Sequence, residues 1–267
     1  MLKQRVVTAI FLVALVLTAL FLPNPIYWRV LISAAILIGF WEWLRFCDIH
    51  SMFAKVASYS LFGIGFYLLQ AGFLSIEFVV YMACALWVVL LGFTLTSVFD
   101  FLHNTVIKLL IGVAVLSLSG TIVIEFKTLS HGPFWVLCFM VSVWAADVGA
   151  YFVGKRFGKT KLAPKVSPGK TIEGMFGGIG LVLLVYVPVL FYFFEYKAAL
   201  LLLLTLVVTT LVSVGGDLFE SKMKRYADIK DSSQILPGHG GVLDRIDSLL
   251  SGAPFFALGL IALGYIN

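Results

Sequence analysis

Charged residues are scarce in this 267-residue sequence, and that scarcity argues against a soluble fold. Asp, Glu, Lys and Arg make up 12% of the chain, whereas hydrophobic residues make up 61%. A soluble domain is about a quarter charged, so a chain of this composition cannot cover its surface in water. The mean hydropathy of +1.05 indicates instead a protein whose solvent is a lipid bilayer.

Cysteine is also rare, and its placement gives no support to a disulfide scaffold or a thiolate metal site. Cys47, Cys84 and Cys138 are far apart, lie in or near apolar runs and form no CxxC pair, so we expect small buried core residues. The first apolar run lacks a small-residue cleavage site before Pro23. We therefore expect a retained membrane span rather than a cleaved signal peptide.

The apolar runs predict an all-α polytopic membrane protein with about nine spans, because unpaired backbone groups are too costly in hydrocarbon. The expected spans are 6–22, 27–45, 56–72, 75–99, 105–124, 133–154, 172–194, 198–216 and 246–265. Placing the N-terminus in the cytosol puts 16 of the 19 Lys and Arg residues in cytosolic loops. The positive-inside rule therefore predicts a cytosolic N-terminus and an outside C-terminus.

Acidic residues are concentrated in the second half of the chain. Nine of the fourteen lie between Asp147 and Asp247. We therefore expect N-terminal transmembrane helices over 1–125 and a C-terminal catalytic region over 126–267. Its polar loops, at 155–171 and 217–245, are expected on the cytosolic face.

The first polar cluster begins inside a span. Asp147 lies eight residues before Lys155, about 12 Å below the loop in a helix. A carboxylate at this depth is costly unless it is paired, binds a cation or faces water; a helix–helix salt bridge is the alternative reading. The segment 154–160 resembles a P-loop, but only three residues separate its glycines where the motif has four, so Walker A chemistry is rejected.

The loop that follows suits a phosphate group. Lys165, Ser167, Lys170 and Thr171 supply ammonium and hydroxyl donors, and Glu173 follows. If a helix begins near Thr171, its first amides also favour an anion. The alternative is that the lysines only anchor the loop to anionic lipid.

Small residues follow at helical spacing after this loop. Gly174, Gly177 and Gly178 have the pattern that lets membrane helices approach closely. We therefore expect a packing role for these glycines, in preference to contact with a ligand.

The second polar cluster is denser and has two parts. If the helix continues past Asp217, this residue shares a face with Glu220, Ser221 and Lys224 by i+3, i+4 and i+7 spacing. Two carboxylate-bearing helix ends at the membrane surface suit Mg²⁺, which favours one or two carboxylates plus substrate phosphate oxygens.

The last span carries the other part. If its helix begins near Leu243, Asp244, Asp247 and Ser248 share a second face. His239 lies between glycines in a turn, where contact with a ligand and a capping or packing role are about equally consistent with the sequence.

The second cluster resembles the signature of the CTP:phosphatidate cytidylyltransferases, the CDP-diacylglycerol synthases. The family pattern is S-x-x-K-R-x4-K-D-x-[small]-x2-[apolar]-P-x-H-G-G-x-x-D-R-x-D, and it matches without a gap from Ser221 to Asp247. Residues 147–151 and 167–173 also resemble family stretches, so the close resemblance covers roughly 140–250.

This resemblance implies a reaction: CTP and phosphatidate give CDP-diacylglycerol and pyrophosphate, with Mg²⁺ required and K⁺ as a second cation. It implies metal carboxylates at Asp217 and Asp244, with Asp247 nearby, and a homodimer. The residues then expected in catalysis are Asp217, Lys224, Arg225, Asp231, His239, Asp244, Arg245 and Asp247. Those expected to bind substrate are Asp147, Lys165, Ser167, Lys170, Thr171, Glu173, Ser221, Lys222 and Lys230.

The expected partners are CTP, phosphatidate and membrane lipid, without nucleic acid, at the cytoplasmic membrane. Two other functions remain open at this point. A CTP-dependent lipid kinase would share the membrane, the nucleotide and Mg²⁺ but would release CDP. A membrane transporter would explain Asp147 within a span, but it predicts paired halves, and the uneven distribution of charge argues against that. The motif of the CDP-alcohol phosphotransferases is absent from the sequence.

Overall fold

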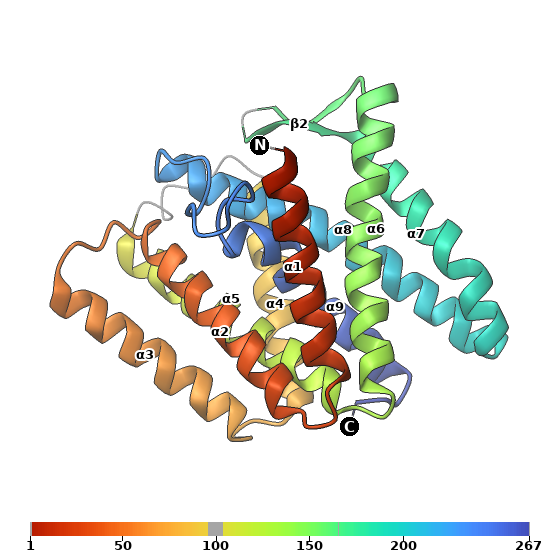
Figure 1. Ribbon diagram of the computed structural model, residues 1–267, viewed down its shortest axis with the longest axis horizontal. Helices are drawn as coiled ribbons and strands as arrows, with labels where there is room; N and C mark the ends of the chain where they lie inside the picture. The colour runs from red at the N-terminus through yellow and green to blue at the C-terminus, as the bar shows by residue number, and fades with distance from the viewer. Residues whose placement is uncertain (1, 96–103, 165, 267) are drawn as a thin grey trace.

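The computed structural model describes residues 2–95, 104–164 and 166–266. Within them, nine helices are long and apolar enough to cross a membrane, which confirms the expected fold class (Figure 1). They are α1 (Leu2–Phe21), α2 (Ile26–Leu44), α3 (Met52–Gln70), α4 (Ile76–Leu95), α5 (Thr105–Glu125), α6 (Gly132–Phe157), α7 (Ile172–Phe193), α8 (Tyr196–Tyr226) and α9 (Leu243–Ala262).

Two short elements connect these helices. A 3-10 turn, η2 (Phe126–Thr128), follows α5, and an antiparallel hairpin of β1 (Lys161–Ala163) and β2 (Ser167–Thr171) joins α6 to α7. The hairpin lies at the same end of the bundle as the start of α1, and the chain ends at the opposite end (Figure 1). The two termini therefore lie at opposite ends, as an odd number of spans requires.

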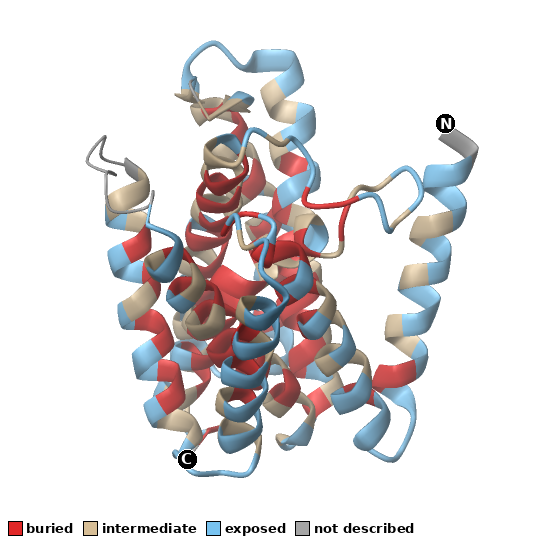
Figure 2. Ribbon diagram, turned by 90° about the vertical axis from the view of Figure 1, so that its left-hand side faces the viewer, coloured by how far each residue is buried: buried red, intermediate tan, exposed pale blue. Residues whose placement is uncertain are grey.

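The buried residues face the centre of the bundle, and apolar side chains cover its outside (Figure 2). Ile10 and Phe11 of α1 are each more than 60% exposed, and α1 is exposed along most of its length (Figure 2). Exposed apolar surface of this extent is what a lipid environment requires. The three cysteines are buried and unpaired, as expected.

Helices α6 and α7 pack closely because glycines line their contact. A Cβ atom at Gly178 would lie 2.6 Å from the carbonyl oxygen of Ala146, and one at Gly174 would lie 2.9 Å from that of Ala150. At Gly177 it would lie 2.3 Å from Cβ of Val153. The predicted packing role of these glycines is confirmed, and it places the hairpin directly above the α6–α7 pair.

Helix α8 is longer than the sequence predicted, and this is a correction. We expected a span over 198–216 and a polar loop over 217–245, but α8 continues to Tyr226. Residues 155–157 of the other predicted loop are likewise the last turn of α6. Charged residues did not end either helix, because side chains three and four positions apart pair along a helical face.

Candidate active site

A polar cavity of about 360 Å³ brings together carboxylates from three helices. Asp147 comes from α6, Asp217 and Lys224 come from α8, and Asp244 and Asp247 come from α9. The remaining lining residues are Val143, Trp144, Asp231, Arg245, Ser248 and Leu249. The cavity thus unites Asp147 from the first polar cluster with the second cluster.

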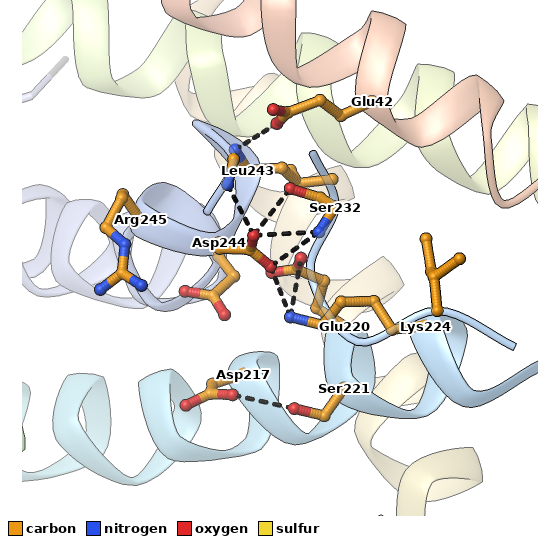
Figure 3. A network of polar contacts seen from close by, with 12 residues as sticks. Glu42, Asp217, Glu220, Ser221, Lys224, Ser232, Leu243, Asp244 and Arg245 are labelled. Atoms are coloured by element: carbon orange, nitrogen blue, oxygen red, sulfur yellow. Dashed lines mark hydrogen bonds and ion pairs between the residues drawn. The ribbon is translucent and has the colours of Figure 1, made fainter. Parts of the chain in front are cut away.

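Lys224 is one of two cationic residues that line this cavity, with Arg245. Its Nζ lies 2.6 Å from Oδ1 of Asp244 and 3.3 Å from Oε1 of Glu220 (Figure 3). Glu220 is buried, and its carboxyl group also contacts that of Asp247. One ammonium group is thus shared by two carboxylates, and the continuation of α8 brings Lys224 and Glu220 to Asp244 of α9.

Asp244 is held on both carboxylate oxygens. Besides Lys224, it accepts hydrogen bonds from the backbone N–H and the hydroxyl of Ser232, each at 3.0 Å to Oδ2, and from the N–H of Gly241 at 2.8 Å (Figure 3). These bonds tie the loop after α8 to the first turn of α9. Asp244 is therefore fixed in direction before any substrate is present.

Asp217 makes a different kind of contact. Its Oδ2 lies 2.6 Å from Nζ of Lys170 on β2, and its Oδ1 accepts a hydrogen bond of 3.2 Å from the hydroxyl of Ser221. Both members of the Lys170 pair are partly exposed. The hairpin is thus joined to α8 by an ion pair that solvent can reach.

Asp247 lies close to α8 because of Gly216. A Cβ atom at Gly216 would lie 2.0 Å from Oγ of Ser251 and 3.2 Å from the carbonyl oxygen of Asp247, so only glycine allows this approach of α8 and α9. Oδ1 of Asp247 accepts a hydrogen bond of 2.7 Å from the N–H of Ser248. This close crossing brings Asp247 into the same cavity as Asp217.

Two residues of the predicted phosphate loop are held by the loop itself. Thr171 is the N-cap of α7, where its hydroxyl accepts a hydrogen bond from the N–H of Gly174. Glu173 accepts hydrogen bonds of 3.1 Å from the N–H groups of Lys159 and Thr160. These contacts shape the hairpin. Lys165 lies outside the described residues.

Other predicted site residues lie around the cavity rather than in its wall. Lys230 lines a separate pocket of about 620 Å³, which Asp231 also borders. Arg225 donates to the carbonyl oxygen of Ile229 at 3.5 Å. Within the described chain, the wall of the polar cavity does not include Ser167, Lys170, Thr171, Glu173, Ser221, Lys222, Arg225, Lys230 or His239.

A second, apolar cavity of about 360 Å³ meets the polar one. It lies between α1, α2, α6 and α9, and Trp144, Arg245 and Leu249 line both cavities. His239 also borders it, and the carbonyl oxygen of His239 accepts a hydrogen bond of 3.0 Å from Nε of Arg245. The guanidinium of Arg245 therefore stands at the junction between a polar and an apolar space.

One buried carboxylate beside the site was missed at the level of sequence. Glu42 of α2 is fully buried and accepts hydrogen bonds from the N–H groups of Val242 and Leu243. The available signal was an acidic residue inside an otherwise apolar span, which is rare and often functional. Glu42 was overlooked because most acidic residues lie in the second half of the chain.

The described residues contain no group of three or more His, Cys, Asp or Glu side chains arranged to hold a metal ion by themselves. The donor types nevertheless suit Mg²⁺, since Asp217, Asp244 and Asp247 line one cavity together with Asp147. Mg²⁺ commonly takes one or two carboxylates and completes its shell with substrate phosphates and water. The residues present therefore fit a Mg²⁺ site whose remaining ligands come from the substrate and from water.

Comparison with known proteins agrees with this geometry. The model of the cytidylyltransferase family matches residues 3–263. The chain is 37% identical to a protein of Haemophilus influenzae over 96% of this chain and 98% of that protein, and 39% identical to one of Pseudomonas aeruginosa over 99% of each. A Bacillus subtilis relative is 36% identical over 97% of this chain and 98% of its own. All three are named phosphatidate cytidylyltransferase. The chain therefore belongs to the cytidylyltransferase family.

Proposed function

We propose that this chain is a phosphatidate cytidylyltransferase of phospholipid biosynthesis, which converts CTP and phosphatidate to CDP-diacylglycerol and pyrophosphate. One structural observation carries the proposal beyond the family: a polar cavity rich in carboxylates meets an apolar cavity at Arg245. Such a junction suits a reaction between a soluble nucleotide and a lipid. The names of the relatives supply the substrates.

In the proposed reaction, a phosphate oxygen of phosphatidate attacks the α-phosphorus of CTP. The bond from that phosphorus to the bridging oxygen breaks, and pyrophosphate leaves with the electron pair. The attacking phosphate is already anionic near neutral pH, so no strong general base is needed. Catalysis then consists mainly of positioning and charge neutralisation.

The basic side chains would divide the phosphates of the two substrates among them. Arg245, at the junction of the cavities, is placed for the lipid phosphate, and Lys224 lies deeper in the polar cavity. The other cations proposed for the phosphates are Lys165, Lys170, Lys222 and Arg225. The pocket bordered by Lys230 and Asp231 offers CTP an approach to the polar cavity.

We propose Mg²⁺ as the cofactor, held by Asp217, Asp244 and Asp247, with K⁺ as a second cation. Bound Mg²⁺ would neutralise charge on the nucleotide phosphates. Incorporation of label from α-³²P-CTP into lipid should stop when EDTA removes divalent ions and return with Mg²⁺. The same rate without divalent ions would remove Mg²⁺ from the proposal, and equal rates in KCl and NaCl would remove K⁺.

The decisive experiment follows the products of α-³²P-CTP and phosphatidate with detergent-purified protein. We expect labelled CDP-diacylglycerol, lost in Asp244→Ala. Labelled CDP without labelled lipid would instead indicate a lipid kinase. If well-folded protein yields neither product, a transport function becomes the better explanation.

We place the protein in the cytoplasmic membrane with its active site and N-terminus on the cytosolic side. The excess of Lys and Arg at the end that carries the hairpin supports this orientation. Lys159→Cys lies in the exposed segment between α6 and β1, and Lys197→Cys lies at the start of α8, at the other end of the bundle. An impermeant maleimide should label position 159 only in inverted vesicles and position 197 only in right-side-out vesicles; the buried native cysteines give little background. The reverse pattern would overturn the orientation.

We also propose a homodimer without a nucleic-acid partner. The dimer is proposed from the family resemblance. A nucleic-acid partner is not expected, because phosphate substrates and membrane topology account for the basic residues. Mass photometry of protein in lipid nanodiscs should give particles heavier than empty nanodiscs by twice the mass of one chain. An added mass of one chain, with full activity, would contradict the dimer. Retardation of DNA or RNA in gels would show that the protein does bind nucleic acid.

A further inference from the structure

The last turn of α2 contacts the start of α9, although about 200 residues separate them in sequence. Glu42 has no exposed surface. Its Oε1 accepts a hydrogen bond of 3.0 Å from the N–H of Val242, and its Oε2 accepts one of 2.6 Å from the N–H of Leu243 (Figure 3). The hydroxyl of Ser233 also donates to Oε1. Both oxygens of Glu42 therefore have donors.

These contacts replace a cap that α9 lacks locally. The first N–H groups of a helix have no partner within the helix, and Val242, at the N-cap of α9, supplies no side-chain cap within the described chain. The Glu42 carboxylate satisfies two of these amides and places a negative charge at the positive end of the helix. The start of α9 is thus set by α2.

Arg45, one turn further along, holds the loop before α9. Its guanidinium donates to the carbonyl oxygen of Ser232, and the N–H and hydroxyl of the same serine donate to Asp244. The end of α2 is therefore connected to Asp244 by two routes, one through the α9 amides and one through Ser232. Asp244 in turn lies 2.6 Å from Lys224.

The end of α2 is itself firmly anchored. Nε1 of Trp43 donates to the carbonyl oxygen of Lys108 at 2.9 Å, and Nζ of the buried Lys108 donates to the carbonyl oxygen of Phe46 at 2.9 Å. Trp43 packs directly over Gly112, where a Cβ atom would lie 2.1 Å from the indole nitrogen. Because the end of α2 is anchored in this way, it can hold the start of α9 in a fixed position.

We propose that Glu42 and Arg45 are positioning residues of the cytidylyl-transfer site: they fix the direction of Asp244 and of the Asp247 turn from outside the cavity. The inference rests on the proposed function. Displacement of a reacting group by about 1 Å can cost a hundredfold in rate. Loss of the support should therefore lower turnover more than substrate binding.

Glu42→Gln is the sharpest test, because it keeps shape but turns an NH₂ group toward backbone N–H donors. We expect kcat to fall about 10- to 100-fold with the KM for CTP changed less than about threefold. Amide hydrogen exchange in a peptide that covers 241–246 should become faster. Tyr186→Phe is the matched control, since it removes another buried hydrogen bond, to the carbonyl oxygen of Cys138, away from α9. It should leave kcat and this exchange unchanged.

Arg45→Met provides a second route if Glu42→Gln does not fold, because Arg45 is exposed. It should lower kcat about 3- to 10-fold. Arg45→Met combined with Ser232→Ala should lose less than the product of the two separate losses, since both weaken the route through Ser232 to Asp244.

The outcomes separate the two proposals. No labelled lipid from folded wild-type protein overturns the proposed function. An active wild type, with folded Glu42→Gln and Arg45→Met variants that keep kcat within about twofold, overturns the positioning role alone. A loss of the same size in Tyr186→Phe, or fully multiplicative losses in the double variant, also overturns it.

Discussion

The first five helices and the last four satisfy their buried charges in different ways. In α1–α5, the buried Glu42 and Lys108 bond to backbone groups and to a serine hydroxyl. In α6–α9 and the β1–β2 hairpin, charged side chains also pair with one another, as Lys224 does with Asp244 and Lys170 does with Asp217. Backbone partners cannot leave, whereas side-chain partners can be exchanged for a phosphate or a cation. From this contrast we expect the first half to support the site and the second half to carry the reaction.

The strongest test removes the central cation of the reactive half. In Lys224→Met, Glu220 and Asp244 lose their shared partner in a buried site. Leaving buried charges uncompensated costs about 3–5 kcal/mol, so we expect a large drop in the melting temperature and loss of labelled-lipid formation. Lys224→Arg keeps the charge and should retain more of the stability. A stable and active Lys224→Met protein would remove the contrast between the two halves.

Removing a buried charged group from the first half should lower stability more than turnover. Lys108→Met removes the bond to the carbonyl oxygen of Phe46, but Trp43 still bonds to the backbone of residue 108. Because a buried acceptor loses its partner, we expect a loss of about 1–3 kcal/mol in thermal unfolding, with kcat reduced less than about fivefold. If kcat falls as far as in Lys224→Met, the division between support and reactive halves is wrong.

Breaking the partly exposed ion pair between Lys170 and Asp217 should weaken the binding of CTP. Lys170→Met frees Asp217 from its 2.6 Å contact. A pair that solvent reaches contributes at most about 1 kcal/mol to stability, so thermal unfolding should barely change. We expect the KM for CTP to rise about tenfold, measured by initial rates over a range of CTP. Lys159→Met, which removes an exposed lysine just before β1, is the control and should leave KM unaltered.

The smallest effect is expected at the surface of the first half. Arg29 and Glu125 form a partly exposed pair at 3.7 Å, at the end of the bundle away from the hairpin. Arg29→Ala should change stability by less than about 0.5 kcal/mol and leave turnover unchanged. A measurable loss of kcat here would show that the first half takes part in the reaction beyond its support of α9.

The sequence allowed the nine spans and the main cavity residues to be predicted, because long apolar runs and intramembrane carboxylates have strong physical signals. The end of the predicted span 75–99 lies in part outside the described residues. The apolar run predicted a span that ends at 216, and the alternative that the helix continues, with Asp217, Glu220 and Lys224 on one face, is the one that α8 follows. The hairpin at 161–171 is too short to show a periodic pattern.

Tertiary contacts were harder to predict than spans. That Lys170 would meet Asp217 and that Glu42 would cap α9 depends on how distant helices cross, which local patterns do not encode. Asp244 was expected as a metal ligand, but its bonds to Ser232 and Gly241 show a second task, holding the loop to α9. Its metal role stays a prediction.

The placement of Arg245 in the walls of both cavities has a consequence for kinetics. A lipid that enters along the apolar cavity is supplied by diffusion in two dimensions, whereas the nucleotide is supplied from solution. Adding inert phospholipid at constant total phosphatidate should then slow turnover, whereas diluting the vesicles with buffer that holds CTP at the same concentration should not. The rate would follow the mole fraction of phosphatidate in the membrane rather than its bulk concentration, so the composition of the bilayer itself would set how fast its own precursor is consumed.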